Sequence, residues 1–272
     1  MAIREPPADR PVARPAPGGS GTTSVRILEC DPELAVRVPA QQVPRARAAL
    51  VTRVTALEPG MWEAPEELDA RHLGFLLLEG VLARDVILAG TRCTELLGAG
   101  DIVQPFAAER ADALVRYRVL WHAIEPVTFA ELDEHFHRSL GEWPQVMAVL
   151  LERALKQSLR TSIHAALLEL SPAETRLLIL FWFLAERWGR VTPGGVALTL
   201  RLSHRMLGQL VGCRRSSVTT ALHRIEQSGL VARRADGTWL LRGSPPDELA
   251  HLRWSEHGAA SGEAGVHMPA AG

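Results

Sequence analysis

Arginine, serine, threonine and histidine recur at helical spacing within Leu202–Gly229, and these side chains could bind a polar, anionic partner. Val218, Leu222 and Ile225 repeat at intervals of four and three, which is the period of one buried helical face. The polar residues between them therefore face outward: Arg215, Ser216, Thr219, Thr220 and His223. Guanidinium and hydroxyl groups can read base edges in the major groove of DNA. The pattern predicts a recognition helix.

A shorter helix is predicted immediately before it. Ser203 is suited to capping a helix N-terminus, and Leu207, Leu210 and Val211 follow with helical spacing. Gly212 then offers a backbone that adopts left-handed conformations at little cost. Two helices joined by a tight turn are expected.

A β-hairpin is predicted after the second helix. Asp236-Gly237 lies between two short apolar runs, and Asp-Gly is a strong hairpin signal. Two helices followed by such a hairpin form a winged helix-turn-helix. Residues 201–242 hold eight arginines against Glu226 and Asp236, a net charge of +6, whereas the whole chain carries −1. Local positive charge on a nearly neutral chain indicates a nucleic-acid-binding face.

The stretch resembles the winged helix-turn-helix of the Crp–Fnr superfamily of bacterial transcription regulators. The family core Thr/Ser-Arg-x-x-Leu/Ile-Ala/Gly-x-x-Val/Leu-Gly is similar to residues 203–212, which read SHRMLGQLVG. Well-known members continue with Arg-Glu-Thr-Val-x-Arg, where this chain has RSSVTT over residues 215–220. Arg215 is kept, while Ser216 and Thr220 replace the acidic residue and the second arginine. The resemblance implies DNA binding but a different operator sequence.

DNA contacts divide into those that read bases and those that fix the protein on the phosphates. We predict that Arg215 binds guanine, with Ser216 and Thr220 as further base-contacting residues. The predicted phosphate contacts are Ser203, Gln209, Arg214, Ser217 and Arg234. A two-fold dimer would place its recognition helices in successive major grooves, so a pseudo-palindromic operator is expected.

Short β-type runs separated by glycine-containing turns fill much of residues 25–129 and favour a β-roll. The expected strands are Leu50–Leu57, Gly74–Leu78, Val81–Leu88, Thr91–Leu97 and Val115–Ile124. The arrangement resembles the double-stranded β-helix (jelly-roll) sensor of the same superfamily, in which Gly-Asp precedes a Gly-Glu-Leu/Ile-Gly cassette and an Arg-Ser/Thr-Ala motif that hold a cyclic nucleotide. Here Asp101 is followed by Ile102-Val103-Gln104-Pro105. Cyclic-nucleotide binding in the usual mode is therefore not expected, no cofactor is predicted, and any other effector is unidentified.

A long helix is predicted from Trp143 to about Leu170, with a row of apolar residues at four-residue intervals. The row is Leu151, Leu155, Leu159, Ile163 and Leu167. This apolar face is wider than the β-roll needs, which favours packing against a second copy. The resemblance implies the same, because the family dimerises along this helix. The predicted dimer interface is Leu151, Leu155, Leu159 and Ile163.

The expected fold class is α+β, with a jelly-roll sensor, a dimerisation helix and a C-terminal winged helix-turn-helix. Ser171-Pro172-Ala173-Glu174 predicts a capping box with proline at the first helical position, and so the start of the last domain. Both ends of the chain lack apolar periodicity and are expected to be disordered. The predicted divisions are a tail at 1–24, a cyclic-nucleotide-binding-like β-roll at 25–141, the dimerisation helix at 142–170, the winged helix-turn-helix at 171–249 and a tail at 250–272.

The remaining candidates for chemistry are isolated. His72, His122 and Cys93 could each be proposed as a haem ligand, but single residues of this kind are more often structural. His135 and His137 point in different directions on a helix and cannot share one ion. A metal-dependent enzyme built on a β-roll needs several histidine and carboxylate ligands at strand spacing, and the sequence contains no such set. We therefore predict no catalytic residue and no metal site.

The expected partners are double-stranded DNA, a second copy of the chain and, by resemblance, RNA polymerase. Three isolated cysteines and the absence of a signal-type or membrane-spanning apolar run favour a cytoplasmic protein. One alternative is an effector-free DNA-binding protein whose β-domain serves only dimerisation or a protein partner. Another is a metal-dependent enzyme built on the β-roll.

Overall fold

The structure is a computed structural model that describes residues 23–65, 71–105 and 114–246. The chain divides into two compact units. Met1–Glu169 and Gly208–Arg214 belong to the first unit, and Leu170–Leu207 and Arg215–Gly272 belong to the second. The predicted tails lie outside the described residues, apart from Thr23 and Ser24, which open the first strand. No helix in the described ranges is both long and apolar enough to cross a membrane.

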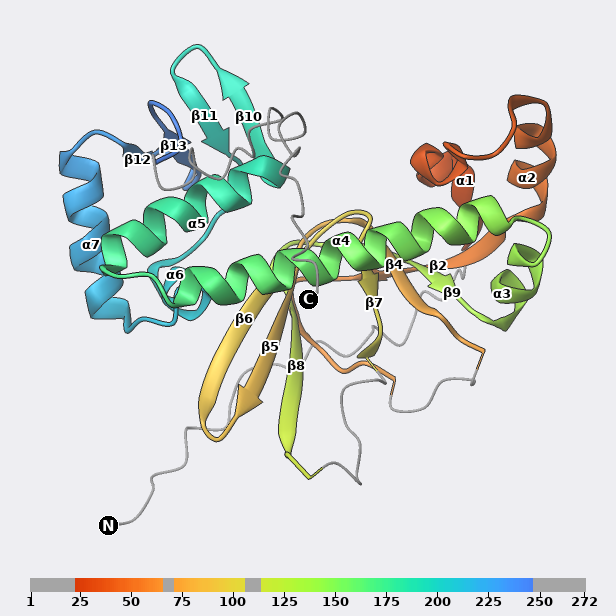
Figure 1. Ribbon diagram of the computed structural model, residues 1–272, viewed down its shortest axis with the longest axis horizontal. Helices are drawn as coiled ribbons and strands as arrows, with labels where there is room; N and C mark the ends of the chain where they lie inside the picture. The colour runs from red at the N-terminus through yellow and green to blue at the C-terminus, as the bar shows by residue number, and fades with distance from the viewer. Residues whose placement is uncertain (1–22, 66–70, 106–113, 247–272) are drawn as a thin grey trace, which may run out of the picture. The chain divides into compact units, whose positions relative to one another are not determined.

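Two antiparallel sheets form the β-domain of the first unit (Figure 1). One has the order β1 (Thr23–Arg26), β2 (Val51–Leu57), β9 (Val127–Leu132), β4 (Gly74–Glu79) and β7 (Ile102–Val103). The other has the order β3 (Gly60–Trp62), β8 (Tyr117–Ala123), β5 (Leu82–Leu88) and β6 (Thr91–Leu97). The five strands predicted from sequence are confirmed with small shifts in their bounds. An apolar core that includes Phe75, Leu82, Leu97, Trp121 and Phe129 joins the two sheets.

Glycine is required at one crowded turn of this domain. Gly80, after β4, has a φ of +88°, and a Cβ there would lie 2.0 Å from the carbonyl oxygen of Pro126. Both the left-handed backbone and the lack of space exclude a side chain. Gly80 therefore fixes the turn at which the chain passes from β4 in one sheet to β5 in the other.

Residues 27–49 form short helices inside the range 25–141 that was predicted as a β-roll. They form α1 (Ile27–Cys30), two short 3-10 helices (Pro32–Ala35 and Ala40–Gln42) and α2 (Val43–Ala49). Prolines stand in the first turn of two of these elements, at Pro32 and Pro44, where the fixed φ and the missing N–H favour a helix start. These helices share a second core with Phe136, Trp143, Val146 and Leu150.

The helix on which His135 and His137 were expected is α3 (Glu134–Leu140). Asp133 caps it by accepting a hydrogen bond from the Phe136 N–H at 2.9 Å, while Glu131 and Leu132 complete β9. The long helix α4 (Pro144–Leu168) has the predicted extent, with Pro144 at its start. Figure 1 shows α1, α2 and α3 gathered at the N-terminal end of α4.

The second unit combines helices with a small antiparallel sheet. Its elements are α5 (Ala173–Trp188), β10 (Gly189–Thr192), β11 (Gly195–Leu198), α7 (Arg215–Gln227), β12 (Val231–Arg233) and β13 (Trp239–Leu241), with strand order β10, β11, β13, β12. Trp239 is fully buried and packs against Phe181 of α5 with ring centroids 5.0 Å apart. The helix α6 (His204–Leu210) begins in this unit, and its last residues belong to the first.

The capping box predicted at Ser171–Glu174 is wrong. Pro172 itself is the N-cap residue of α5 and makes no side-chain cap, and the Ser171–Pro172 peptide bond is cis. The Glu174 carboxylate accepts a hydrogen bond from Arg224 of α7 instead of serving a reciprocal cap. The helix starts where it was predicted, but through a different local geometry.

Candidate DNA-binding surface and effector pocket

Helix α7 has one buried and one exposed face, as its sequence predicts. Val218, Ala221, Leu222 and Ile225 are buried. The other face is exposed and carries Arg215, Ser216, Ser217, Thr219, Thr220 and His223. Arg215 is the first residue of the helix and forms no ion pair among the described residues. Its guanidinium is therefore available to an external acceptor.

Two threonines on this face are oriented by hydrogen bonds to the helix backbone. The Thr219 hydroxyl donates to the Arg215 carbonyl at 3.0 Å, and the Thr220 hydroxyl donates to the Ser216 carbonyl at 3.3 Å. Each hydroxyl uses its one proton in this way. The Thr219 oxygen also lies 3.1 Å from Nδ1 of His204, whereas the Thr220 oxygen accepts no hydrogen bond within the described ranges. Thr220 thus offers an acceptor and a methyl group, which suit an amino group or a thymine methyl.

The first helix of the motif is capped by Ser203, whose hydroxyl accepts from the Met206 N–H at 3.2 Å. The Ser203 hydroxyl proton stays available, as a phosphate contact requires. Gln209 lies half-buried in α6, and Arg214 is exposed just before α7. Gly212 has a φ of +64°, which confirms the left-handed turn predicted there.

The hairpin predicted at Asp236-Gly237 is confirmed by the antiparallel pairing of β12 with β13. The Asp236 carboxylate accepts from the Thr238 hydroxyl at 2.5 Å and from its N–H at 2.9 Å. These two hydrogen bonds lower the pKa of Asp236. Arg233 lies over the Trp239 ring, 5.6 Å from its centroid, whereas Arg234 is exposed at the turn. Arg234 is therefore the better placed of the two arginines to reach a phosphate.

Helix α4 leaves most of its predicted apolar row uncovered. Leu151, Leu155, Leu159 and Ile163 are 59%, 63%, 61% and 46% exposed. Leu167, the next residue of the row, is buried at 3% exposure. The exposed row is thus four residues long and coincides with the predicted dimer interface.

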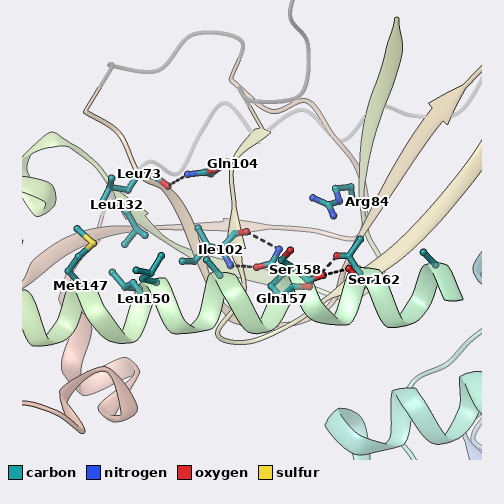
Figure 2. A pocket seen from close by; sticks show the side chains of 14 residues that line it. Leu73, Arg84, Ile102, Gln104, Leu132, Met147, Leu150, Gln157, Ser158 and Ser162 are labelled. Atoms are coloured by element: carbon teal, nitrogen blue, oxygen red, sulfur yellow. Dashed lines mark hydrogen bonds between the residues drawn. The ribbon is translucent and has the colours of Figure 1, made fainter. Parts of the chain in front are cut away.

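A pocket of about 660 Å³ lies between the β-domain and α4 (Figure 2). Its apolar lining comes from both sides: Leu73, Ile102, Leu132, Met147, Leu150, Leu151, Ala154 and Ala165. Its polar lining consists of Arg84, Gln104, Gln157, Ser158, Thr161 and Ser162. The volume is typical of a site for a small organic molecule.

Most polar groups of the pocket already have partners in the protein. Gln157 of α4 accepts from the Ile102 N–H at 3.1 Å and donates to the Ile102 carbonyl at 3.2 Å. Gln104 donates to the Leu73 carbonyl at 3.0 Å. Arg84 of β5 forms an ion pair with Glu95 of β6. The pocket is therefore held together by its own side chains.

The position of the family's nucleotide cassette is used differently here. Asp101 is buried, accepts from the Gly98 N–H at 2.9 Å and pairs with Arg160 of α4. Pro105 is buried and provides no backbone N–H for a phosphate. Residues 106–113, where the rest of a cassette would stand, lie outside the described residues. The described part of the segment is bound to α4 and offers no phosphate cradle.

The isolated histidines occupy ordinary positions. His72 Nδ1 accepts a hydrogen bond from the Gly74 N–H at 2.9 Å, and His137 Nδ1 lies 3.1 Å from the Arg71 carbonyl oxygen. Cys93 is exposed on β6. Within the described ranges, no three potential ligands come together to hold a metal ion.

Sequence reasoning did not identify the pocket residues. The α4 signal is visible in retrospect, because Gln157, Ser158, Thr161 and Ser162 recur along the helix at spacings of three and four. Arg84 carries no such signal. It stands in a strand, and only the pairing of β5 with β6 and β8 places it beside α4.

Comparison with known proteins agrees with this architecture. Residues 165–243 match the Crp-like helix-turn-helix domain family. A curated relative, the global nitrogen regulator of Synechococcus elongatus, is 28% identical over 115 residues, a match that covers 41% of this chain and 52% of that protein. The chain thus spans about half the length of that relative.

Solved structures share the fold over a larger part of the chain. FixK2 from Bradyrhizobium japonicum has a TM-score of 0.56 at 18% identity, covering 75% of this chain and 98% of that one. A CooA mutant from Carboxydothermus hydrogenoformans has a TM-score of 0.53 at 23% identity, covering 71% and 84%. The c-di-GMP responsive global regulator CLP from Xanthomonas campestris has a TM-score of 0.54 at 18% identity, covering 76% and 100%. Residues 165–243 thus match a Crp-like helix-turn-helix domain, and the chain shares the fold of these solved structures.

Proposed function

We propose that this protein is a homodimeric transcription regulator that binds a pseudo-palindromic DNA operator. The observation that carries the proposal is the exposed face of α7, where Arg215, without an ion-pair partner among the described residues, is followed by hydroxyl side chains. Arg215 would bind a guanine, with Ser216 and Thr220 reading adjacent bases. Ser203, Gln209, Arg214, Ser217 and Arg234 would contact phosphates and set the register. The sequence divisions at 142–170 and 171–249 serve as the dimerisation and DNA-binding segments in this proposal.

The exposed row on α4 supports the dimer. Four aliphatic side chains at four-residue intervals form a continuous stripe, and burying a leucine or isoleucine fully is worth about 1.5–3 kcal/mol. Packing α4 against the α4 of a second copy would remove this stripe from water. The same contact would relate the two recognition helices by a two-fold axis, which requires a two-fold symmetric operator.

The pocket favours a gated regulator over the effector-free alternative. A β-domain that served only dimerisation would have no need of a cavity of about 660 Å³ beside the dimerisation helix. Leu151 belongs both to the pocket lining and to the exposed row. A molecule in the pocket would therefore touch the helix that sets the dimer geometry. Gating by a cyclic nucleotide in the family's usual mode remains outside the proposal, since the phosphate cradle is missing from residues 101–105.

The proposal is tested by selecting binding sites from random duplex DNA with the full-length protein, together with its sedimentation mass. We expect a two-fold symmetric motif and a dimer. Arg215→Ala should cost about 1–3 kcal/mol on the selected site and relax the preference at one base pair in each half-site.

The matched control is Arg190→Ala, which removes an exposed arginine from β10, away from α7. It should leave the sequence preference unchanged. An equal loss of affinity for all DNA sequences in the Arg215 variant would refute the base-contacting role, and a monomer that selects no symmetric motif would refute the proposed function.

A further inference from the structure

His204 of α6 contacts the recognition helix α7 through a hydroxyl group. Its Nδ1 atom lies 3.1 Å from the Thr219 oxygen. The one proton of that hydroxyl is donated to the Arg215 carbonyl at 3.0 Å, so the oxygen is left to accept from the imidazole. Nδ1 therefore carries a proton, and this hydrogen bond fixes the tautomer of the neutral ring. Nε2 of His204 forms no hydrogen bond within the described ranges and is left for an external partner.

The ionisable side chains that flank this contact in the two helices are basic. Arg215 and His223 lie one turn before and one turn after the threonine on α7, and Arg205 follows His204 on α6. The carboxylate of α7, Glu226, lies two turns further along the helix. Within the described part of the chain His204 forms no ion pair with a carboxylate. A phosphate group at His204 would thus meet positive charge from both helices.

A phosphate contact at Nε2 requires the charged form of the His204 ring. While Nδ1 holds the proton of the neutral imidazole, Nε2 is an acceptor and presents a lone pair to the phosphate oxygen. A proton added to Nε2 gives the imidazolium, in which both nitrogens donate and the positive charge attracts the phosphate. Histidine side chains gain and lose this charge between about pH 5 and 8. The contact therefore forms together with the uptake of a proton from solvent.

We propose that His204 is a further phosphate-contacting residue, whose imidazolium donates from Nε2 to the DNA backbone, so that DNA binding takes up a proton in each protomer. The inference rests on the proposed function, since it concerns the regulation of the same DNA-binding surface. A group whose protonated form is stabilised in a complex favours binding at low pH, and this contribution is lost as the pH rises through its pKa in the complex. Mild acidification therefore tightens DNA binding by this chain.

The test measures binding of the full-length protein to random-sequence duplex DNA by fluorescence anisotropy, at fixed ionic strength, at about pH 6 and about pH 8. Phosphate contacts do not depend on the base sequence, so the operator need not be known. We expect an affinity about tenfold higher at the lower pH, as for a hydrogen bond to a charged group.

Two substitutions of His204 separate its charge from its shape. His204→Gln should lose most of the difference between the two pH values. At the lower pH it should also reduce the slope of log affinity against log salt concentration by about one for each protomer. His204→Arg should bind DNA with the same affinity at both pH values, because the guanidinium stays charged throughout this range.

His223→Gln is the matched control, because His223 lies on the same face of α7 but its Nε2 is 2.9 Å from the Gln227 amide nitrogen. This variant should keep the pH dependence. The inference is overturned if the unsubstituted protein binds DNA equally at both pH values, or if His204→Gln and His223→Gln lose the difference to the same extent. A protein that bound no DNA at either pH would overturn the proposed function as well, whereas pH-independent DNA binding overturns this inference alone.

Discussion

The recognition face of α7 and the pocket beside α4 are both rich in polar side chains, but they differ in what those side chains bind. On α7, the Arg215 guanidinium has no ion-pair partner among the described residues, and the Thr220 hydroxyl keeps its acceptor capacity. In the pocket, Gln157, Gln104 and Arg84 are engaged with the protein itself. The first region can accept a partner without rearrangement, whereas the second must exchange internal contacts for external ones. In the proposed function, this difference distinguishes the DNA-binding surface from the regulatory pocket.

The largest expected effect lies in the core beneath the recognition face. Trp239→Ala should destabilise the second unit by about 3–5 kcal/mol, because a fully buried aromatic side chain is lost. Unfolding in denaturant measures this change in the free energy of unfolding, and DNA binding is measured on the same variant. Trp239→Phe should cost much less, since it also removes a buried indole N–H that has no hydrogen-bond partner in the described part of the chain. Equal costs for the two variants would show that packing of the ring against Phe181 is not what holds this core.

On the pocket side, Gln157→Leu should destabilise the first unit by about 1–3 kcal/mol. The substitution leaves the Ile102 N–H and carbonyl without their partner. Ser158→Ala is the control, since Ser158 lines the pocket but its hydroxyl forms no hydrogen bond within the described ranges. It should change the free energy of unfolding by less than about 0.5 kcal/mol. If the two variants were equally stable, the pocket's polar groups would not be structural, and the contrast with α7 would fail.

These two regions also differ in how far the sequence predicts them. The α7 face follows from a local period of apolar residues, so Arg215, Ser216 and Thr220 were identified correctly as exposed without any tertiary knowledge. The Asp236-Gly237 turn was equally readable, because its conformation depends on two residues. The pocket depends on Arg84, Ile102 and Thr161, which are distant in sequence, and no local pattern brings them together.

The predictions that were wrong, for residues 27–49 and for Ser171–Glu174, also failed because tertiary contacts decide the structure there. The helices over residues 27–49 are short, and their apolar residues face a core made with Phe136 and Val146, so their spacing carries no clear helical period. At Ser171–Glu174 the local pattern was right for a capping box, yet Arg224 from α7 took the Glu174 carboxylate. Tertiary partners override local propensity where the local preference is worth only about 1 kcal/mol.

A smaller effect on DNA affinity is expected from Thr220, and it tests whether this residue contacts a base. Thr220→Val keeps the methyl group and removes the hydroxyl acceptor. We expect it to lower affinity by about 1 kcal/mol at one base pair per half-site if that position presents an amino group, and to be neutral if it presents a thymine methyl. Thr220→Ser should show the opposite pattern. Affinities on single-base variants of the selected operator provide the measurement, and identical profiles for all three proteins would remove Thr220 from the base contacts.

The smallest expected effect concerns the ion pair between Arg224 of α7 and Glu174 of α5. Hydrogen bonds from its own backbone N–H and from Arg224 lower the pKa of Glu174. A lowered carboxylate pKa contributes stability above the unfolded pKa, and this contribution is lost as the pH falls through the folded value. Arg224 is 66% exposed, so Arg224→Ala should cost only about 0.5 kcal/mol at pH 7. The difference from the unsubstituted protein should shrink as the pH drops below 4.5, the ordinary pKa of glutamate; a difference that grew on acidification would contradict the assignment.

The hydrogen bonds between Gln157 and Ile102 also bear on the solubility of the protein. Strand β7 stands at the open edge of its sheet, where unpaired backbone groups can template pairing with other chains. The Gln157 amide occupies both the N–H and the carbonyl of Ile102, and so ends the sheet as a further strand would, without offering a new edge. Lifting α4 would uncover that edge. The helix that is proposed to mediate pairing between two copies thereby also covers the edge of the β-domain at which a further strand could otherwise add.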